Sequence, residues 1–170
     1  ARAVTLLRAH RPLLYLGWGA AGAGPDLVRL AEALGSPVAT TITGKGVFPE
    51  SHPLFLWNGF GDAAPGFVRD AVRTCGVTLA IGCRFSEVGT GSYSSAPVGP
   101  LIHADIDAGV FGRNFPAEVT LHGDAAGTVS ALLEALGSTE PRRDAALEAR
   151  IRSEEHTSEL QSPCNLVCRL

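Results

Sequence analysis

The chain has 170 residues, of which 45% are hydrophobic and 18% are charged, and this predicts one globular domain with a real core. Its net charge of −3 offers no basic surface, so we expect neither a nucleic acid nor a membrane as a partner. No apolar run approaches the roughly 20 residues that span a bilayer, and no leader resembles a signal peptide, so we expect a cytoplasmic protein.

Two features concern the ends of the sequence. It contains no Met, so we expect that Ala1 is not a natural start and that the chain is an internal fragment. Up to Arg152 the only lysine is Lys45 and there is no glutamine, whereas residues 152–162 resemble one translated frame of a sequencing adapter. We therefore interpret residues 152–170 as an artefact, and we do not interpret Cys164 and Cys168 as a zinc site.

The N-terminal part predicts a helix and then a glycine turn after a strand. Residues 1–10 read as the remnant of a linker helix, and residues 12–17 are a continuous apolar run typical of a buried strand. The segment Gly17-Trp18-Gly19-Ala20-Ala21-Gly22 is close to the dinucleotide turn G-x-G-x-x-G and is expected to open the helix that ends at Leu34. The alternative is that these glycines only permit a tight turn.

A second strand is predicted at residues 37–41, after Gly35 in a left-handed helix cap. In the polar loop that follows, Lys45 is either a phosphate contact or a solvated side chain, and we favour the second interpretation. His52, before a proline, is read as a turn or packing residue. The segment 58–61, Asn-Gly-Phe-Gly, precedes a helix predicted at 62–74.

A third strand at residues 77–82 ends beside Arg84, which is a candidate for binding phosphate or carboxylate unless it pairs with Glu87. A fourth strand at 101–107 ends in Asp105 and Asp107. Two carboxylates at a strand end could hold a metal, but no further ligand is evident, and we favour hydrogen bonds to a ribose hydroxyl.

The C-terminal part predicts a fifth strand at 118–124, a helix at 125–136 capped by Gly137, and the start of a linker at 138–151. Cys75 and Cys83 are read as isolated buried thiols. Five strands that alternate with helices or loops predict an α/β fold, namely a doubly wound, mostly parallel, Rossmann-like sheet with helices on both faces. Right-handed crossovers would bring the strand-end glycines to one edge of this sheet.

The ordered motifs from residue 11 to residue 137 resemble the central domain of thiamine-diphosphate-dependent enzymes of the acetolactate synthase type. The segments that carry the resemblance are Arg11-Pro12, Gly17-x-Gly19-Ala20, Pro37-Val38, Thr40-Thr41, Gly44-Lys45-Gly46, His52-Pro53-Leu54, Gly59-Phe60-Gly61, Ile81-Gly82-Cys83-Arg84-Phe85, Asp105-Ile106-Asp107 and Gly123-Asp124. Any one of them is weak, whereas the ordered set is specific.

The resemblance implies an enzyme that acts on 2-oxo acids with thiamine diphosphate and Mg²⁺, as a homodimer or homotetramer, with FAD in the central domain of acetolactate synthases. The resemblance implies that the binding sites for thiamine diphosphate and Mg²⁺ lie outside this chain. We therefore expect no catalytic and no metal-binding residue in the chain, and no activity of the chain alone. The expected nucleotide-binding residues are Gly17, Gly19, Gly59, Phe60, Gly61, Gly82, Arg84, Asp105, Ile106 and Asp107.

One departure leaves the flavin open. The family turn usually reads R-F-D-D-R, whereas this chain has Arg84-Phe85-Ser86-Glu87-Val88 and lacks the second arginine. The resemblance therefore implies either a flavin-binding acetolactate synthase or a flavin-free carboligase or decarboxylase. The alternative from another class is a freestanding nucleotide- or flavin-binding module of the electron-transfer flavoprotein type.

Overall fold

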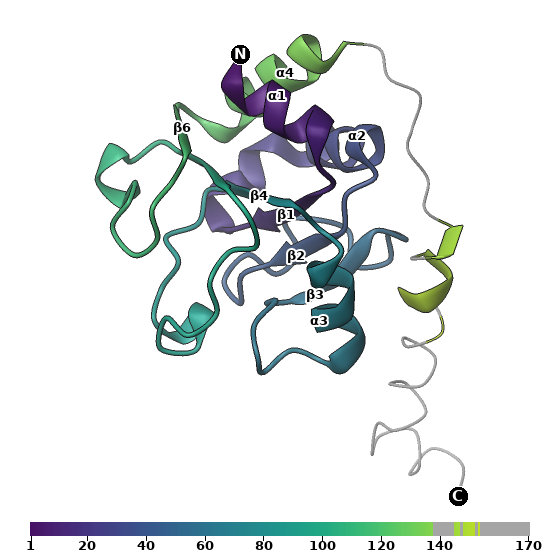
Figure 1. Ribbon diagram of the computed structural model, residues 1–170. Helices are drawn as coiled ribbons and strands as arrows, with labels where there is room; N and C mark the ends of the chain where they lie inside the picture. Colours follow the sequence, from purple (N-terminus) through teal and green to yellow (C-terminus); the bar gives the residue numbers. More distant parts are fainter. Residues whose placement is uncertain (138–144, 147, 152, 154–170) are drawn as a thin grey trace, which may run out of the picture.

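The computed structural model describes residues 1–137, 145–146, 148–151 and 153, and this part of the chain is built around one sheet (Figure 1). Its helices are α1 (Arg2–Ala9), α2 (Gly24–Leu34), α3 (Gly66–Arg73) and α4 (Ala125–Leu136). Its strands are β1 (Pro12–Leu16), β2 (Val38–Thr40), β3 (Phe55–Asn58), β4 (Val77–Ile81), β5 (Leu101–Asp105) and β6 (Val119–His122). Most of the predicted linker start, and all of the predicted adapter segment except Ser153, lie outside the described residues.

The six strands form a wholly parallel sheet in the order β3-β2-β1-β4-β5-β6. The chain passes from β1 through α2 to β2 in one direction, and from β3 through α3 back across β1 to β4 in the other. Because such crossovers are right-handed, α2 and α3 cover opposite faces of the sheet. The predicted doubly wound α/β class is therefore confirmed, and the direction reverses between β1 and β4, where such folds bind ligands.

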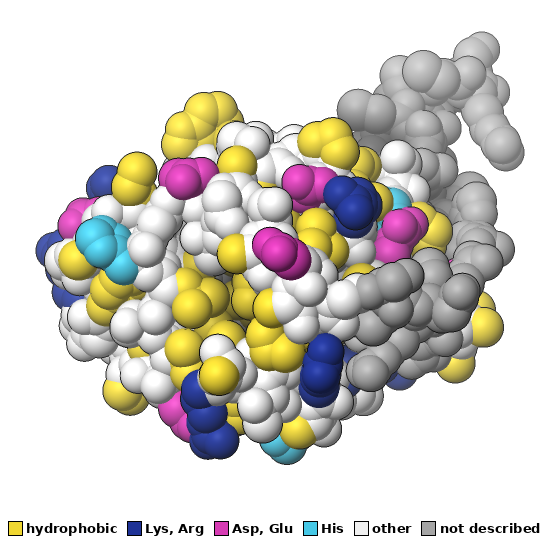
Figure 2. All heavy atoms as spheres, turned by 90° about the horizontal axis from the view of Figure 1, so that it is seen from above, with side chains coloured by type: hydrophobic (Ala, Val, Ile, Leu, Met, Phe, Trp, Pro, Cys, Tyr) yellow, Lys and Arg dark blue, Asp and Glu magenta, His cyan; other side chains and the backbone are white. Residues whose placement is uncertain are grey.

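The centre of the sheet is fully buried. Every residue of β1 and β4 is buried. Strands that are covered on both faces of a sheet are apolar along their length, and this is why the sequence shows these two strands as nearly continuous apolar runs. On one face, α4 packs against both α2 and α1, which gather at the top of Figure 1. Seen from above, this side shows hydrophobic side chains between charged ones (Figure 2). The buried residues of α2 and α4 show that these helices cover the core on this side.

The predicted N-terminal helix is confirmed as α1 and is part of the packed fold. Leu6 and Leu7 are buried in the core. Arg8 donates through Nη2 to the Leu136 carbonyl at 3.1 Å, so it binds a carbonyl at the end of α4 that has no partner within the helix. The domain boundaries proposed from the sequence stay a prediction.

Three element predictions were wrong in detail. β3 was missed, because Phe55–Asn58 is a four-residue edge strand directly after a proline-containing turn. The helix expected from residue 62 begins only at Gly66, after Pro65. The strand expected to reach Asp107 ends at Asp105, because the Asp105 carboxylate accepts a hydrogen bond from the Asp107 amide (2.9 Å) and turns the backbone. The left-handed cap at Gly35, with φ 60°, is confirmed.

Candidate functional site

Two glycine turns meet at the point where the strand order reverses. A Cβ added to Gly17 would lie 2.0 Å from the Gly82 carbonyl oxygen, and one added to Gly82 would lie 2.4 Å from the Ala20 nitrogen. Gly82 also has a positive φ of 62°. No other residue type allows two backbones to come this close, so Gly17, Gly19 and Gly82 are explained by contact between the turns.

The same contact uses the amides of these glycines. Gly17 N donates to the Ile81 carbonyl (2.9 Å), Gly19 N to the Gly82 carbonyl (3.1 Å), and Gly82 N to the Ala104 carbonyl (2.9 Å). Sequence reasoning left open whether the turn cradles a ligand or only permits a tight bend. Because all three amides are already bonded, a phosphate bound here needs another donor.

A pocket of about 90 Å³, which we call the aspartate pocket, lies beside these turns. It collects residues from the ends of four strands: Gly19, Gly82, Ala104, Asp105, Ile106, Gly123, Asp124 and Ala125. Four of the predicted site residues are therefore brought together. Asp124, which sequence reasoning quoted only as part of a family motif, was not predicted to lie with them.

The two predicted aspartates have different surroundings. Asp105 lines the aspartate pocket, and among the described residues only its Oδ1 accepts a hydrogen bond, from the Asp107 amide. Asp107 instead caps the short 3-10 helix Ala108–Val110, where its Oδ1 accepts from Gly109 N at 2.9 Å. The carboxylate that shares the pocket with Asp105 is Asp124, whose Oδ1 caps α4 through Gly127 N (2.8 Å). Asp105 is thus the better candidate for holding a ribose hydroxyl.

A second pocket of about 150 Å³, the aromatic pocket, holds the other predicted segment. Its lining includes Gly59, Phe60 and Gly61 after β3, together with Tyr15 and Trp57. A Cβ on Gly61 would lie 1.9 Å from Ser95 Oγ, so this glycine admits the loop that follows β4. Seven of the ten predicted site residues therefore line one of these two pockets, whereas Gly17, Arg84 and Asp107 line neither.

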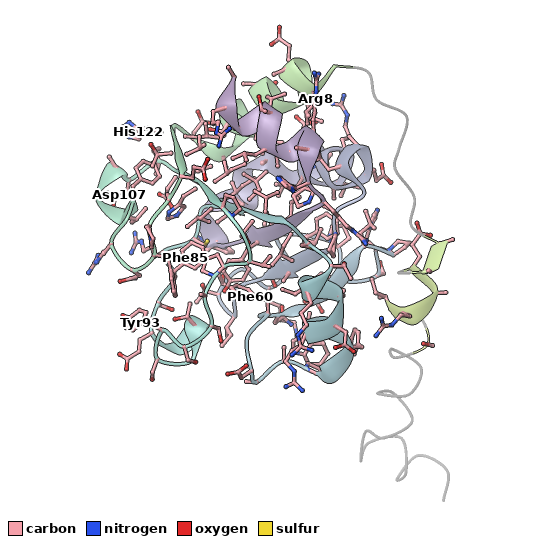
Figure 3. All side chains as sticks on the ribbon, viewed as in Figure 1. Arg8, Phe60, Phe85, Tyr93, Asp107 and His122 are labelled. Atoms are coloured by element: carbon pink, nitrogen blue, oxygen red, sulfur yellow. The ribbon has the colours of Figure 1, made fainter. Side chains whose placement is uncertain are left out.

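A row of aromatic rings connects the regions of the two pockets. Neighbouring ring centroids are 4.7 to 6.2 Å apart. The members, in spatial order, are Phe60, Tyr15, Phe85, His103, Phe111 and His122. Phe60 and Phe85 lie near the middle of the molecule, and His122 and Asp107 lie near each other at its edge (Figure 3).

Burial sets the protonation of the groups in this region. Desolvation raises the pKa of Tyr15, and it raises the pKa of Cys83 more strongly than any other cause. Desolvation also lowers the pKa of His103 below its usual 6.5. These groups are therefore neutral at physiological pH, and Cys83 and Cys75 are free, buried thiols as predicted.

Arg84 follows the Gly82 turn and exposes its side chain. The alternative that it pairs with Glu87 is not seen: among the described residues, no ion pair or hydrogen bond involves its guanidinium. Lys45 is exposed, 4.0 Å from Glu50, as expected for a solvated lysine. His52 is confirmed as a packing residue, because its Nδ1 accepts from Leu54 N and its ring meets the edge of Phe48.

Several large hydrophobic side chains are exposed at the ends of the strands or in the loops that follow them. In the described part of the chain there are five, all at or after the carboxyl end of a strand: Trp18, Ile42, Trp57, Tyr93 and Ile106. Two of them, Ile42 and Trp57, line the aromatic pocket together, and exposed apolar side chains that lie together favour contact with a ligand or another protein surface. The carboxyl edge of the sheet is therefore the candidate functional site.

The sequence matches the family described as thiamine pyrophosphate enzyme, central domain, over residues 1–132. The chain belongs to this family. The match confirms the predicted resemblance, and it gives no support to the alternative of a freestanding electron-transfer flavoprotein module.

Similar proteins come from archaea and bacteria. The chain is 42% identical over 136 residues to a probable acetolactate synthase large subunit of Methanocaldococcus jannaschii, covering 77% of this chain and 22% of that protein. It is 38% identical over 146 residues to the acetolactate synthase large subunit of Parasynechococcus marenigrum, covering 83% and 24%. It is 35% identical over 158 residues to a probable 2-ketoarginine decarboxylase of Pseudomonas aeruginosa, covering 91% and 27%. The chain thus spans about a quarter of the length of these relatives.

Proposed function

We propose that the whole protein is a thiamine-diphosphate- and Mg²⁺-dependent enzyme acting on a 2-oxo acid, and that this chain is its central domain. The support is membership of the central-domain family and similarity to proteins named as acetolactate synthases and as a 2-ketoarginine decarboxylase. Thiamine diphosphate supplies the carbanion chemistry when bound. A homodimer or homotetramer and a cytoplasmic location belong to the same proposal.

The thiamine and its metal would be held by other parts of the protein. In the part of the chain that the structure describes, no group of three or more His, Cys, Asp or Glu side chains could hold a metal ion. Hard cations such as Mg²⁺ need oxygen ligands, usually carboxylates together with substrate phosphates. We therefore expect the chain alone to leave 2-oxo acids unchanged.

At the carboxyl edge we propose a site for a dinucleotide, FAD. The observation that carries this is the position of Asp105 and Arg84 at the ends of the adjacent strands β5 and β4, next to the point where the strand order reverses. Asp105 has a carboxylate oxygen for a ribose hydroxyl. Among the described residues nothing pairs with the Arg84 guanidinium, which is proposed for the diphosphate. In the aromatic pocket the exposed ring of Trp57 is proposed to meet a ring of the ligand.

The test is FAD binding to the chain. Binding is measured by the quenching of flavin fluorescence and by the shift of the melting temperature. At a hundred times its dissociation constant, FAD should stabilise the fold by about 2.7 kcal/mol. Asp105→Asn should weaken binding by about tenfold or more, because a hydrogen bond to a charged group is lost. Asp70→Asn, on the exposed surface of α3, is the matched control and should leave binding unchanged.

Absence of binding to the folded chain would refute the FAD proposal and favour a flavin-free relative. The enzyme proposal has its own test in the full-length protein. Its release of CO₂ from a panel of 2-oxo acids should require both thiamine diphosphate and Mg²⁺. Turnover without either of them would contradict that assignment.

A further inference from the structure

The turn that carries Arg84 is held in an unfavourable backbone conformation. Phe85 has φ 49°, in the left-handed region, although it is not glycine. Such a conformation is unfavourable for a residue with a side chain, because Cβ then approaches the following carbonyl oxygen. It persists only where the surrounding structure determines it, and such strain is concentrated at functional sites. The contacts that hold this turn in its conformation therefore indicate which residue the turn positions.

Three consecutive carbonyl oxygens of this turn accept hydrogen bonds from side chains elsewhere in the chain. His103 Nε2 lies 2.8 Å from the Cys83 oxygen, and Asn114 Nδ2 lies 3.0 Å from the Arg84 oxygen and 2.8 Å from the Phe85 oxygen. Because a carbonyl only accepts, His103 must carry its proton on Nε2. We call these bonds the turn clamp.

The ring of Phe85 fixes the turn from the inside. It is 3% exposed, and its centroid lies 5.5 Å from that of Tyr15, 5.3 Å from that of His103 and 5.4 Å from that of Phe115. Figure 3 shows Phe85 reaching into the body of the molecule. Arg84, between the clamped carbonyls, keeps its side chain in solvent. The clamp thus fixes the backbone of Arg84 without using its guanidinium.

Asn114 also connects the turn to the other proposed contact. It belongs to the loop between β5 and β6, which begins directly after Asp105, and its side chain is the direct link from that loop to the Arg84 carbonyl. The His122 ring, 3.0 Å from the Ile106 oxygen, holds the start of the same loop. The hydrogen bonds of Asn114 and His122 therefore fix the position of the Arg84 backbone relative to the loop after Asp105. The guanidinium of Arg84 and the carboxylate of Asp105 take no part in these bonds.

We propose that Asn114 and His103 are positioning residues, which hold Arg84 ready for the diphosphate of a bound dinucleotide. This inference rests on the proposed function. A guanidinium on a fixed backbone loses less conformational freedom when it binds a phosphate, and its planar fork requires a defined direction. His103 and Asn114 contribute to binding through Arg84 and not through a contact of their own.

A double-mutant cycle tests the inference, with FAD as the probe and ADP as a second probe that lacks the flavin. Arg84→Ala should weaken FAD binding by about tenfold or more, because a charge-assisted contact is lost. Asn114→Ala should weaken it by about fivefold in the parent chain and by less than twofold in the Arg84→Ala background, because coupled residues are not additive. ADP should show the same coupling.

Two further variants separate positioning from general destabilisation. Asn114→Asp keeps the size of the side chain but removes the donor, so it should reproduce the loss seen with Asn114→Ala. Thr74→Ala removes one side-chain bond to a helix carbonyl, Thr74 Oγ1 to Ala71 O at 2.7 Å at the end of α3, and should leave FAD binding unchanged. Urea unfolding would confirm that each variant is folded.

The outcomes distinguish this inference from the proposed function. If Arg84→Ala leaves the affinity for both probes unchanged, the proposed phosphate contact is wrong. If Arg84→Ala weakens binding but Asn114→Ala does not, only the positioning role is refuted. An equal effect of Asn114→Ala in both backgrounds would also refute it, because Asn114 would then act independently of Arg84.

Discussion

The contact between the turns after β1 and β4 makes a strong prediction for Gly82→Ala. The new Cβ would lie 2.4 Å from the Ala20 nitrogen and 2.4 Å from the Gly19 carbonyl carbon. Both are backbone atoms, so no side chain can rotate away. To reach ordinary van der Waals distance the two turns must separate by about 1 Å, at the carboxyl ends of two buried central strands.

Two costs combine in this variant. Forcing a close-packed region apart costs about 1–3 kcal/mol, and an alanine at φ 62° costs about 1–2 kcal/mol more. Gly82→Ala should therefore lower the free energy of unfolding by about 3 kcal/mol and the melting temperature by about 6–12 °C. Chemical denaturation in urea measures the first quantity, and calorimetry measures the second.

Gly46→Ala is the matched control. Gly46 also has a positive φ, 83°, but a Cβ there would meet nothing within 4 Å. It should therefore lose only the conformational term, about 1–2 kcal/mol. If Gly82→Ala and Gly46→Ala cost the same, the close approach of the turns contributes nothing, and our explanation of the three glycines is wrong.

Three further predictions concern stability. Leu79→Ala, in fully buried β4, should lower the free energy of unfolding in urea by about 2–5 kcal/mol. Leu121→Ala, on the half-buried edge strand β6, should lower it clearly less, and similar losses in the two variants would contradict the assigned core. Asp124→Ala should cost about 1 kcal/mol because it removes the cap of α4, and Asp124→Ser should recover most of this; no difference between them would exclude a capping role. Burial raises the pKa of the Cys75 thiol from 9.0 to about 11. Between these pH values the folded state keeps a proton that the unfolded state loses, so the free energy of unfolding should fall as the pH rises from 9 to 11. Cys75→Ala should make this decline shallower, and an unchanged slope would refute the assignment.

Much of the fold could be predicted because its central elements are strongly marked. The apolar runs of β1 and β4 are buried along their whole length, and Gly35 ends α2 with the expected left-handed cap. β3 could not be recognised in the same way. Phe55–Asn58 is too short to show a period, and it is completed as a strand by pairing with β2.

The site was predicted only in part because sequence spacing does not show which neighbours share a pocket. Asp105 and Asp107 are two residues apart, yet the backbone turns after Asp105 and leaves Asp107 to cap a short helix. Asp124, which shares the aspartate pocket with Asp105, lies in the turn between β6 and α4. Asn114 carries no motif of its own, and its role depends on two carbonyls that only the folded turn presents.

The central claim is that the carboxyl edge of the sheet binds a dinucleotide, and amide chemical shifts during an FAD titration test it most directly. We predict that the resonances of Phe60, Arg84 and Ile106 shift together with one dissociation constant, while those of Thr5 on α1 and Arg73 on α3 stay in place. Shifts confined to residues away from the carboxyl edge, or no saturable shift in the folded chain, would contradict the account.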